Sequence, residues 1–297
     1  MSLSVLNYPE NTSMNNQSNQ PASLEWELYI LEYARSHNQA VASLVQGAYG
    51  EGVMEVPFAF VLARSGDRVA LIDTGFMNEE SGAAMAQKFN IPRWISPLRL
   101  LGELGIGADQ VGDIVISHAH FDHMGSVDKF PKARLFIQKA ELLSWIEAMA
   151  LPPRFGYLTS ILDPEDIHTV LNAAGEHRLT LLDGDADHVL PGLHVRWGAG
   201  HTIGQQFVIV ETARGRHVVS GDCIYSSRNL TGTNADGVYI PLGTGIGSVW
   251  DQLKTFDRIN QEIAGDLNRL LILHDFDRWS RFKQIKEVEG FGIFQVV

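Results

Sequence analysis

The stretch DIVISHAHFDHMG, residues 113–125, decides the fold and the chemistry of this chain. A short apolar run ends in three histidines and one aspartate, the pattern of a buried strand that delivers side chains at its C-terminal end. His118 and His120 are two residues apart, so they project to the same side of an extended chain, and Asp122 and His123 follow where the chain must turn. Imidazole and carboxylate groups are common metal ligands, so the stretch predicts a metal site. A surface turn that is polar by chance is the alternative.

A metal centre needs more ligands than this loop supplies, and three further candidates follow apolar runs. They are His201 in WGAGHTIG, Asp222 in SGDCIY and His274 in LLILHD. Taken alone, each is better explained as a partly buried polar residue, but their shared position at strand ends favours ligands. With the first loop they make five histidines and two aspartates, enough for two metal ions that share one carboxylate.

HAHFDH followed by GHT, GD and a late histidine at the end of a strand resembles the metallo-β-lactamase superfamily. The resemblance covers about residues 50–290 and includes LIDTG at residues 71–75. It implies an α/β fold, a four-layered αββα sandwich, in which Asp73 is a buried aspartate that supports the metal loop. It also implies a ligand set: His118, His120 and His201 for one ion, Asp122, His123 and His274 for the other, and Asp222 bridging both.

A closer resemblance is to the lactonase branch, the N-acyl-homoserine lactonases and 4-pyridoxolactonase. Tyr225 lies three residues after Asp222, and the last ligand is followed by an aspartate, His274-Asp275. In that branch a tyrosine at this spacing points its hydroxyl at the substrate carbonyl or the leaving oxygen; a core aromatic is the alternative. One departure is Gln205 in GHTIGQQ, where many relatives carry a second histidine, but this position is not a usual ligand.

The resemblance implies a dinuclear metal-dependent hydrolase that opens a lactone through attack of a metal-bridging hydroxide on the carbonyl. Tyr225 would stabilise the oxyanion, and Asp122 or Asp222 would carry a proton to the leaving alkoxide. Nitrogen and oxygen ligands favour two zinc ions, with manganese, iron or cobalt as alternatives. Hydrolysis of a thioester, as in glyoxalase II, or of an amide or another ester is an alternative activity. A metal- and ligand-binding sensor without turnover is a third.

Composition narrows the class of partner. The chain has 297 residues and a formal net charge of −12, and 45% of its residues are apolar. The acidic balance argues against nucleic acid and anionic membranes and leaves a small molecule as the expected substrate. Cys223 is the single cysteine, which excludes an intrachain disulfide. We see no signal-peptide pattern and no membrane-span window and therefore expect a cytoplasmic protein; the oligomeric state is open, and only the base rate points to a homodimer.

The domain organisation follows from the order of apolar patterns. Residues 1–24 are rich in Asn, Ser, Gln and Pro and predict a flexible arm, and residues 25–297 predict a single catalytic domain. We expect strands at 26–34 and 270–275, a hairpin over 56–75, and helices at 139–150 and 248–264. Residues 151–166, with three prolines, predict irregular structure, and residues 226–247 predict a long glycine-rich loop.

Overall fold

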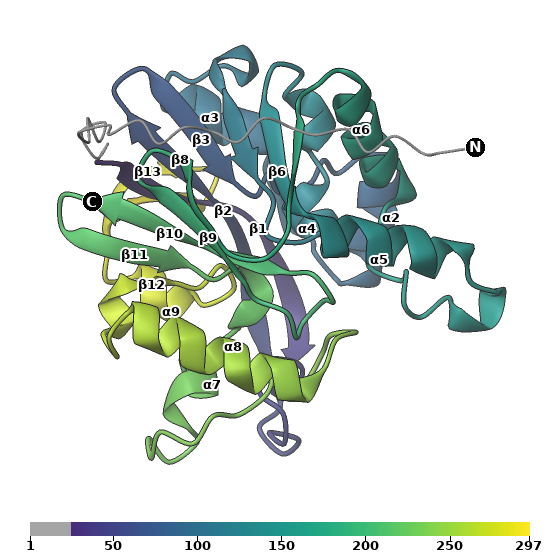
Figure 1. Cartoon of the computed structure of the whole chain (residues 1–297). Coiled ribbons are helices and arrows are strands. Elements are labelled where there is room, and N and C mark those ends of the chain that lie inside the picture. The colour runs from purple at the N-terminus through teal and green to yellow at the C-terminus, as the bar shows by residue number, and fades with distance from the viewer. Residues whose placement is uncertain (1–24) are drawn as a thin grey trace, which may run out of the picture.

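The computed structural model describes residues 25–297, whose strands form two sheets (Figure 1). The predicted arm at 1–24 lies outside the described residues. The first sheet contains, in spatial order, β13 (Lys283–Val288), β14 (Phe291–Gln295), β1 (Glu27–Ala40), β2 (Val53–Ser65), β3 (Arg68–Ile72), β5 (Asp113–Val115), β6 (Arg134–Gln138) and β7 (Leu179–Leu182), with β4 (Arg93–Trp94) paired to β1. The second contains β12 (Leu270–Leu271), β11 (Gly215–Val219), β10 (Gln206–Thr212), β9 (Leu193–Trp197) and β8 (Ala186–Leu190).

Helices flank the two sheets on their outer faces (Figure 1). Their bounds are α1 (Val41–Leu44), α2 (Glu80–Lys88), α3 (Pro97–Glu103), α4 (Phe121–Met124), α5 (Lys139–Ala150), α6 (Pro164–Gly175), α7 (Arg228–Thr231), α8 (Val249–Glu262) and α9 (Phe276–Trp279). None of these helices, nor any other within 25–297, is long and apolar enough to cross a membrane.

The layers follow from the alternation of side chains along each strand. In β1, Leu31 and Tyr33 face the helices α3, α5 and α6, whereas Leu28 and Ile30 face the second sheet. On the far face of the second sheet, Phe207 packs with side chains of α8. Three apolar clusters therefore separate four layers, helices, sheet, sheet and helices, and the predicted αββα sandwich is confirmed.

Parallel strand pairs help to explain why several ligands from distant parts of the chain meet. Strands β3, β5 and β6 run parallel in the first sheet, and β11 and β12 run parallel in the second. The carboxyl ends of parallel neighbours lie at the same edge of a sheet, where α/β proteins bind ligands. Asp73 follows β3, and the segment 117–123, here called the histidine loop, follows β5. Asp222 follows β11, and His274 follows β12.

Several element predictions need correction. Residues 151–166 are not irregular throughout, because α6 begins at Pro164; the Asp163 side chain accepts a hydrogen bond from the Glu165 N–H and caps this helix. The strand expected at 270–275 is confined to Leu270–Leu271, since the chain then turns into the site. The strand expected at 26–34 continues to Ala40, because its pairing with β2 resumes after each of two irregularities in register. The predicted hairpin over 56–75 is confirmed as β2 and β3.

Candidate metal centre

The carboxyl-edge loops bring the seven predicted ligands together in the interior, where none is more than 6% exposed. They fall into two groups whose ligand atoms lie within 4.8 Å of one another, and Asp222 belongs to both. The groups are His118, His120, His201 and Asp222, and Asp122, His123, Asp222 and His274.

In the first group, three imidazole nitrogens and one carboxylate oxygen converge. Nδ1 of His120 lies 3.0 Å from Nε2 of His118 and 3.1 Å from Nε2 of His201. Oδ2 of Asp222 lies 3.6 Å from the His118 nitrogen and 3.4 Å from the His201 nitrogen. A tetrahedral ion with ligand bonds of about 2.0–2.1 Å separates its ligand atoms by roughly 3.3–3.4 Å. The observed spacing therefore fits one small divalent ion.

The second group uses the other oxygen of the shared carboxylate. Oδ1 of Asp222 lies 3.0 Å from Nε2 of His123 and 3.1 Å from Nε2 of His274. Oδ2 of Asp122 lies 3.2 Å from the His123 nitrogen and 3.6 Å from the His274 nitrogen. Because the two oxygens of Asp222 face different groups, this single carboxylate can bridge two ions.

Polar atoms without hydrogen-bond partners support the fit to metal. Nε2 of His123 and Oδ1 of Asp222 are buried, close together and yet not hydrogen-bonded. Unpaired buried polar atoms are costly, and a cation between them would remove that cost. Burial lowers the pKa of His120 to about 3 and also lowers the pKa of His118 and His201, so these three imidazoles are neutral and free to bind metal.

The two histidines of the second group have pKa values shifted in the opposite direction. Burial lowers the pKa of His123, but Asp222, Asp122 and Asp73 raise it by more, so the net shift is upward. The pKa of His274 is raised for the same reason, by Asp222 and Asp122 against burial. The carboxylates here attract positive charge, which a divalent ion would supply in place of protons.

The predicted support residue Asp73 contacts the histidine loop at two points. Its fully buried carboxylate accepts hydrogen bonds from the backbone N–H of Ser117 at 2.7 Å and from the hydroxyl of Ser117 at 2.8 Å. The same carboxylate lies 2.8 Å from Nδ1 of His123, which directs Nε2 of that ring toward the second group. In the same way, Nδ1 of His274 lies 2.8 Å from the carbonyl oxygen of Pro57.

Three supporting residues were not predicted as such from the sequence. The buried hydroxyl of Tyr33 donates to the backbone carbonyl of Asp122 at 2.7 Å. The amide oxygen of Gln205 accepts from the backbone N–H groups of Asp222 and Cys223, each at 2.8 Å. Glu141 is fully buried and bonds to both loops of the first group. Each pairs with backbone far away in the sequence, a contact for which no local pattern exists.

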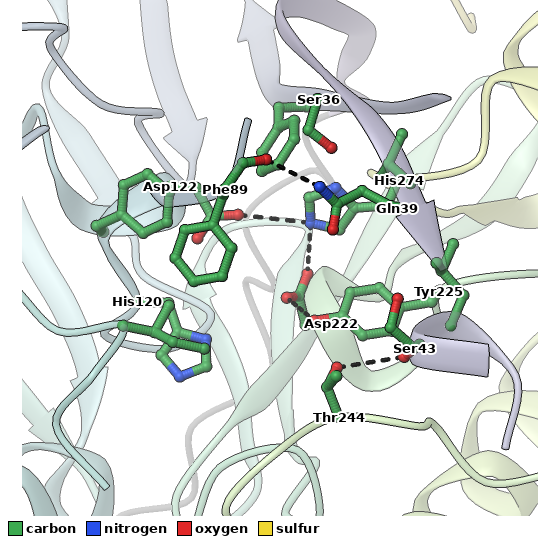
Figure 2. A pocket seen from close by; sticks show the side chains of 15 residues that line it. Ser36, Gln39, Ser43, Phe89, His120, Asp122, Asp222, Tyr225, Thr244 and His274 are labelled. Atoms are coloured by element: carbon green, nitrogen blue, oxygen red, sulfur yellow. Dashed lines mark hydrogen bonds and ion pairs between the residues drawn. The ribbon is translucent and has the colours of Figure 1, made fainter. Parts of the chain in front are cut away.

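Tyr225 lines a cavity whose wall also includes four of the ligands, His120, Asp122, Asp222 and His274 (Figure 2). Its hydroxyl donates to Oδ2 of Asp222 at 2.9 Å, and its ring packs edge-on against His274. Burial, and then the charges of Asp222 and Asp122, raise the pKa of Tyr225 well above its usual value, so the hydroxyl keeps its proton. The cavity holds about 130 Å³, and most of its exposed wall is apolar, with six apolar side chains among the fifteen that line it: Leu44, Val56, Phe58, Phe89, Phe121 and Ile161.

Comparison with known proteins agrees with this geometry. Residues 56–264 match the family model of the metallo-beta-lactamase superfamily. The N-acyl homoserine lactonase AiiB of Agrobacterium fabrum is 28% identical over 252 residues, which cover 80% of this chain and 86% of that protein. The N-acyl homoserine lactonase AiiA of Bacillus thuringiensis subsp. kurstaki is 24% identical over 219 residues, which cover 69% of this chain and 78% of the relative.

Solved structures share the fold at lower identity. An N-acyl homoserine lactone hydrolase with N-hexanoyl-L-homoserine at its catalytic metal centre superposes with a TM-score of 0.69 at 18% identity, covering 89% of this chain and 99% of that one. The dizinc lactonase AidC superposes with a TM-score of 0.63 at 20% identity, covering 90% of this chain and 93% of that one. The chain therefore belongs to the metallo-beta-lactamase superfamily, and it is a metal-dependent hydrolase of that superfamily.

Proposed function

We propose that this protein hydrolyses a lactone at two divalent ions held by the ligand groups described above. The observation that carries the proposal is the position of Asp222, whose two oxygens face the two groups while the Tyr225 hydroxyl lies beside them at the cavity wall (Figure 2). Relatives named as N-acyl homoserine lactonases support a ring ester as the substrate.

The residues of the chain have separate tasks in this reaction. When bound, two divalent ions lower the pKa of a water and polarise the substrate carbonyl. The neutral hydroxyl of Tyr225 donates a hydrogen bond to the oxygen that gains negative charge. Asp122 lines the cavity, and in the metal-free protein His123 and His274 lower its pKa by more than burial raises it. Its carboxylate takes a proton from the attacking water and passes it to the leaving oxygen.

The donor set also guides the choice of metal. Each group offers nitrogen and oxygen atoms at spacings near those of a tetrahedral site, which favours zinc, with manganese, iron or cobalt as alternatives. We also propose that residues 25–297 form one catalytic domain, because ligands that follow β5, β11 and β12 belong to a single centre.

The main alternative is a thioester of glutathione. Such a substrate carries carboxylates that need Lys or Arg, yet no Lys or Arg lines this cavity. The nearby Arg228 lines an adjoining cavity, but its guanidinium already forms a bidentate ion pair with Glu51. Arg278 is buried and donates to the backbone carbonyl of Leu267. The cavity therefore favours an uncharged substrate with an apolar tail.

The test is proton release in a pH-stat, with zinc-loaded protein and a panel of uncharged lactones, glutathione thioesters and cyclic amides. We expect rapid ring opening of lactones, loss of activity on chelation and its return with zinc. The matched control is His120→Ala, which should lose both metal and activity. Rapid turnover of thioesters with none of lactones would reverse the assignment.

A further inference from the structure

Glu141 lies at the start of α5, between the two loops that supply histidines to the first ligand group. Its side chain is fully buried and does not itself belong to either ligand group. A buried carboxylate is rare unless it is paired or fully hydrogen-bonded. The contacts of Glu141 therefore need an explanation.

The two oxygens of this carboxylate divide their contacts between the two loops. Oε1 accepts from the backbone N–H of Ala119 at 3.0 Å and from Nε1 of Trp145 at 2.7 Å. Oε2 accepts from the hydroxyl of Thr202 at 2.7 Å and from the backbone N–H of Gly204 at 2.9 Å. Ala119 lies between His118 and His120, and Thr202 follows His201, so one side chain ties together all three histidines of the first group.

The backbone around these contacts leaves little freedom. A Cβ atom at Gly204 would lie 2.1 Å from the backbone nitrogen of Glu141, so only glycine lets the His201 loop approach α5 this closely. The indole of Trp145, which donates to Glu141, also packs edge-on against the His120 ring with centroids 5.6 Å apart. The second ligand group has no contact of this kind with Glu141; its support comes from Asp73 through His123.

We propose that Glu141 is a positioning residue that sets the metal affinity of the first ligand group without affecting the second directly. All four partners donate, which matches an ionised carboxylate with acceptors on both sides. A glutamine at this position could accept on one side only, and its NH₂ group would face the N–H of Gly204 or the donors of Ala119 and Trp145. The inference rests on the proposed ligand assignment and is independent of the lactone as substrate.

The experiment is a cobalt(II) titration of the metal-free protein, followed by the visible absorbance of the bound ion, with no substrate present. His201→Ala and His123→Ala identify which transition belongs to which ligand group. We expect Glu141→Gln to weaken cobalt binding to the first ligand group, the transition that His201→Ala removes, by about 10–100-fold, the range for outer partners of metal ligands. Cobalt binding to the second group, the transition that His123→Ala removes, should weaken by less than about threefold.

The matched control is Glu32→Gln, which alters an equally buried glutamate whose partners are Arg35 and the backbone N–H of Gly292. It should lower the melting temperature and leave both cobalt transitions in place. If Glu141→Gln does not fold, Thr202→Val removes one donor from Oε2 and should weaken the same transition several-fold.

Each outcome distinguishes the two proposals. Equal weakening of both transitions by Glu141→Gln, or unchanged transitions in the folded variants, would overturn the positioning role. If instead His201→Ala leaves both transitions unchanged, the ligand assignment itself is wrong, whatever Glu141 does.

Discussion

Replacing Asp73 with asparagine tests whether Asp73 supports the histidine loop through its hydrogen bonds or only fills space in the core. Asp73 has a backbone φ of +63°, a left-handed conformation that asparagine tolerates, and the two side chains have nearly the same shape. The variant therefore keeps the shape of the side chain and changes its charge and its hydrogen-bonding character. With one oxygen, asparagine can accept either from the Ser117 N–H or from the Ser117 hydroxyl and Nδ1 of His123, but not from all three.

The size of the effect follows from these contacts. Hydrogen bonds to a charged group contribute about 1.5–3 kcal/mol each, so Asp73→Asn should destabilise the metal-free protein by roughly 2–4 kcal/mol. The free NH₂ group also favours the His123 tautomer that carries its proton on Nε2, the atom that faces the second ligand group. Loss of such a partner weakens metal binding about 10–100-fold, which is roughly 1.4–2.7 kcal/mol of further stability at saturating zinc.

The assay is urea unfolding of the variant and the parent, each with chelator and with excess zinc. We expect a loss in chelator and a larger loss in zinc. The control is Asp266→Asn, the same exchange at an exposed aspartate that accepts a hydrogen bond from the Asn268 N–H. Asp73→Asn with unchanged zinc affinity and equal losses in both conditions would refute the orientation of His123 by Asp73.

Two further predictions concern single side chains. Tyr225→Phe should stay folded and still hold metal at saturating zinc but lower kcat on lactones by roughly 10²–10³-fold, the range for loss of one donor to an oxyanion; an unchanged kcat would leave Tyr225 a packing residue. Burial, and then Asp163, Asp128 and Glu165, raise the pKa of Asp166 to about 8, so folding disfavours its charged form and stability falls as pH rises from about 4 to about 8. Asp166→Asn should therefore raise the unfolding free energy more at pH 8.5 than at pH 5 in urea titrations, and an equal difference at both would contradict this.

The metal ligands were predictable because each follows an apolar strand. His118, Asp222 and His274 end such runs, and ligands at strand ends meet only if those ends lie at one edge of the two packed sheets. The sequence alone does not contain that arrangement, which includes the parallel pairs β11–β12 and β3–β5 and the antiparallel strand β9 that precedes His201. The resemblance to a known family provided what the local patterns could not.

The supporting residues were harder to predict for a physical reason. Glu141 lies in a stretch whose pattern indicates an amphipathic helix, where a glutamate is normally solvated, and its burial depends on loops up to 63 residues away. Tyr33 likewise contacts a loop 89 residues away. In contrast, α6 had a local signal that we missed, since Asp163 and Pro164 form an N-cap and a first-turn proline.

The two supporting carboxylates lead to a final prediction about how they act together. Asp73 accepts a hydrogen bond from the N–H of Ser117, and Glu141 accepts one from the N–H of Ala119, two residues further along the same loop. If this loop is displaced as a unit, losing one anchor reduces what the other contributes. The double variant Asp73→Asn/Glu141→Gln should then lose less unfolding free energy in chelator than the sum of the single losses. Separate anchors would give additive losses within about 0.5 kcal/mol, so additivity in urea titrations would show that the loop does not move as one body.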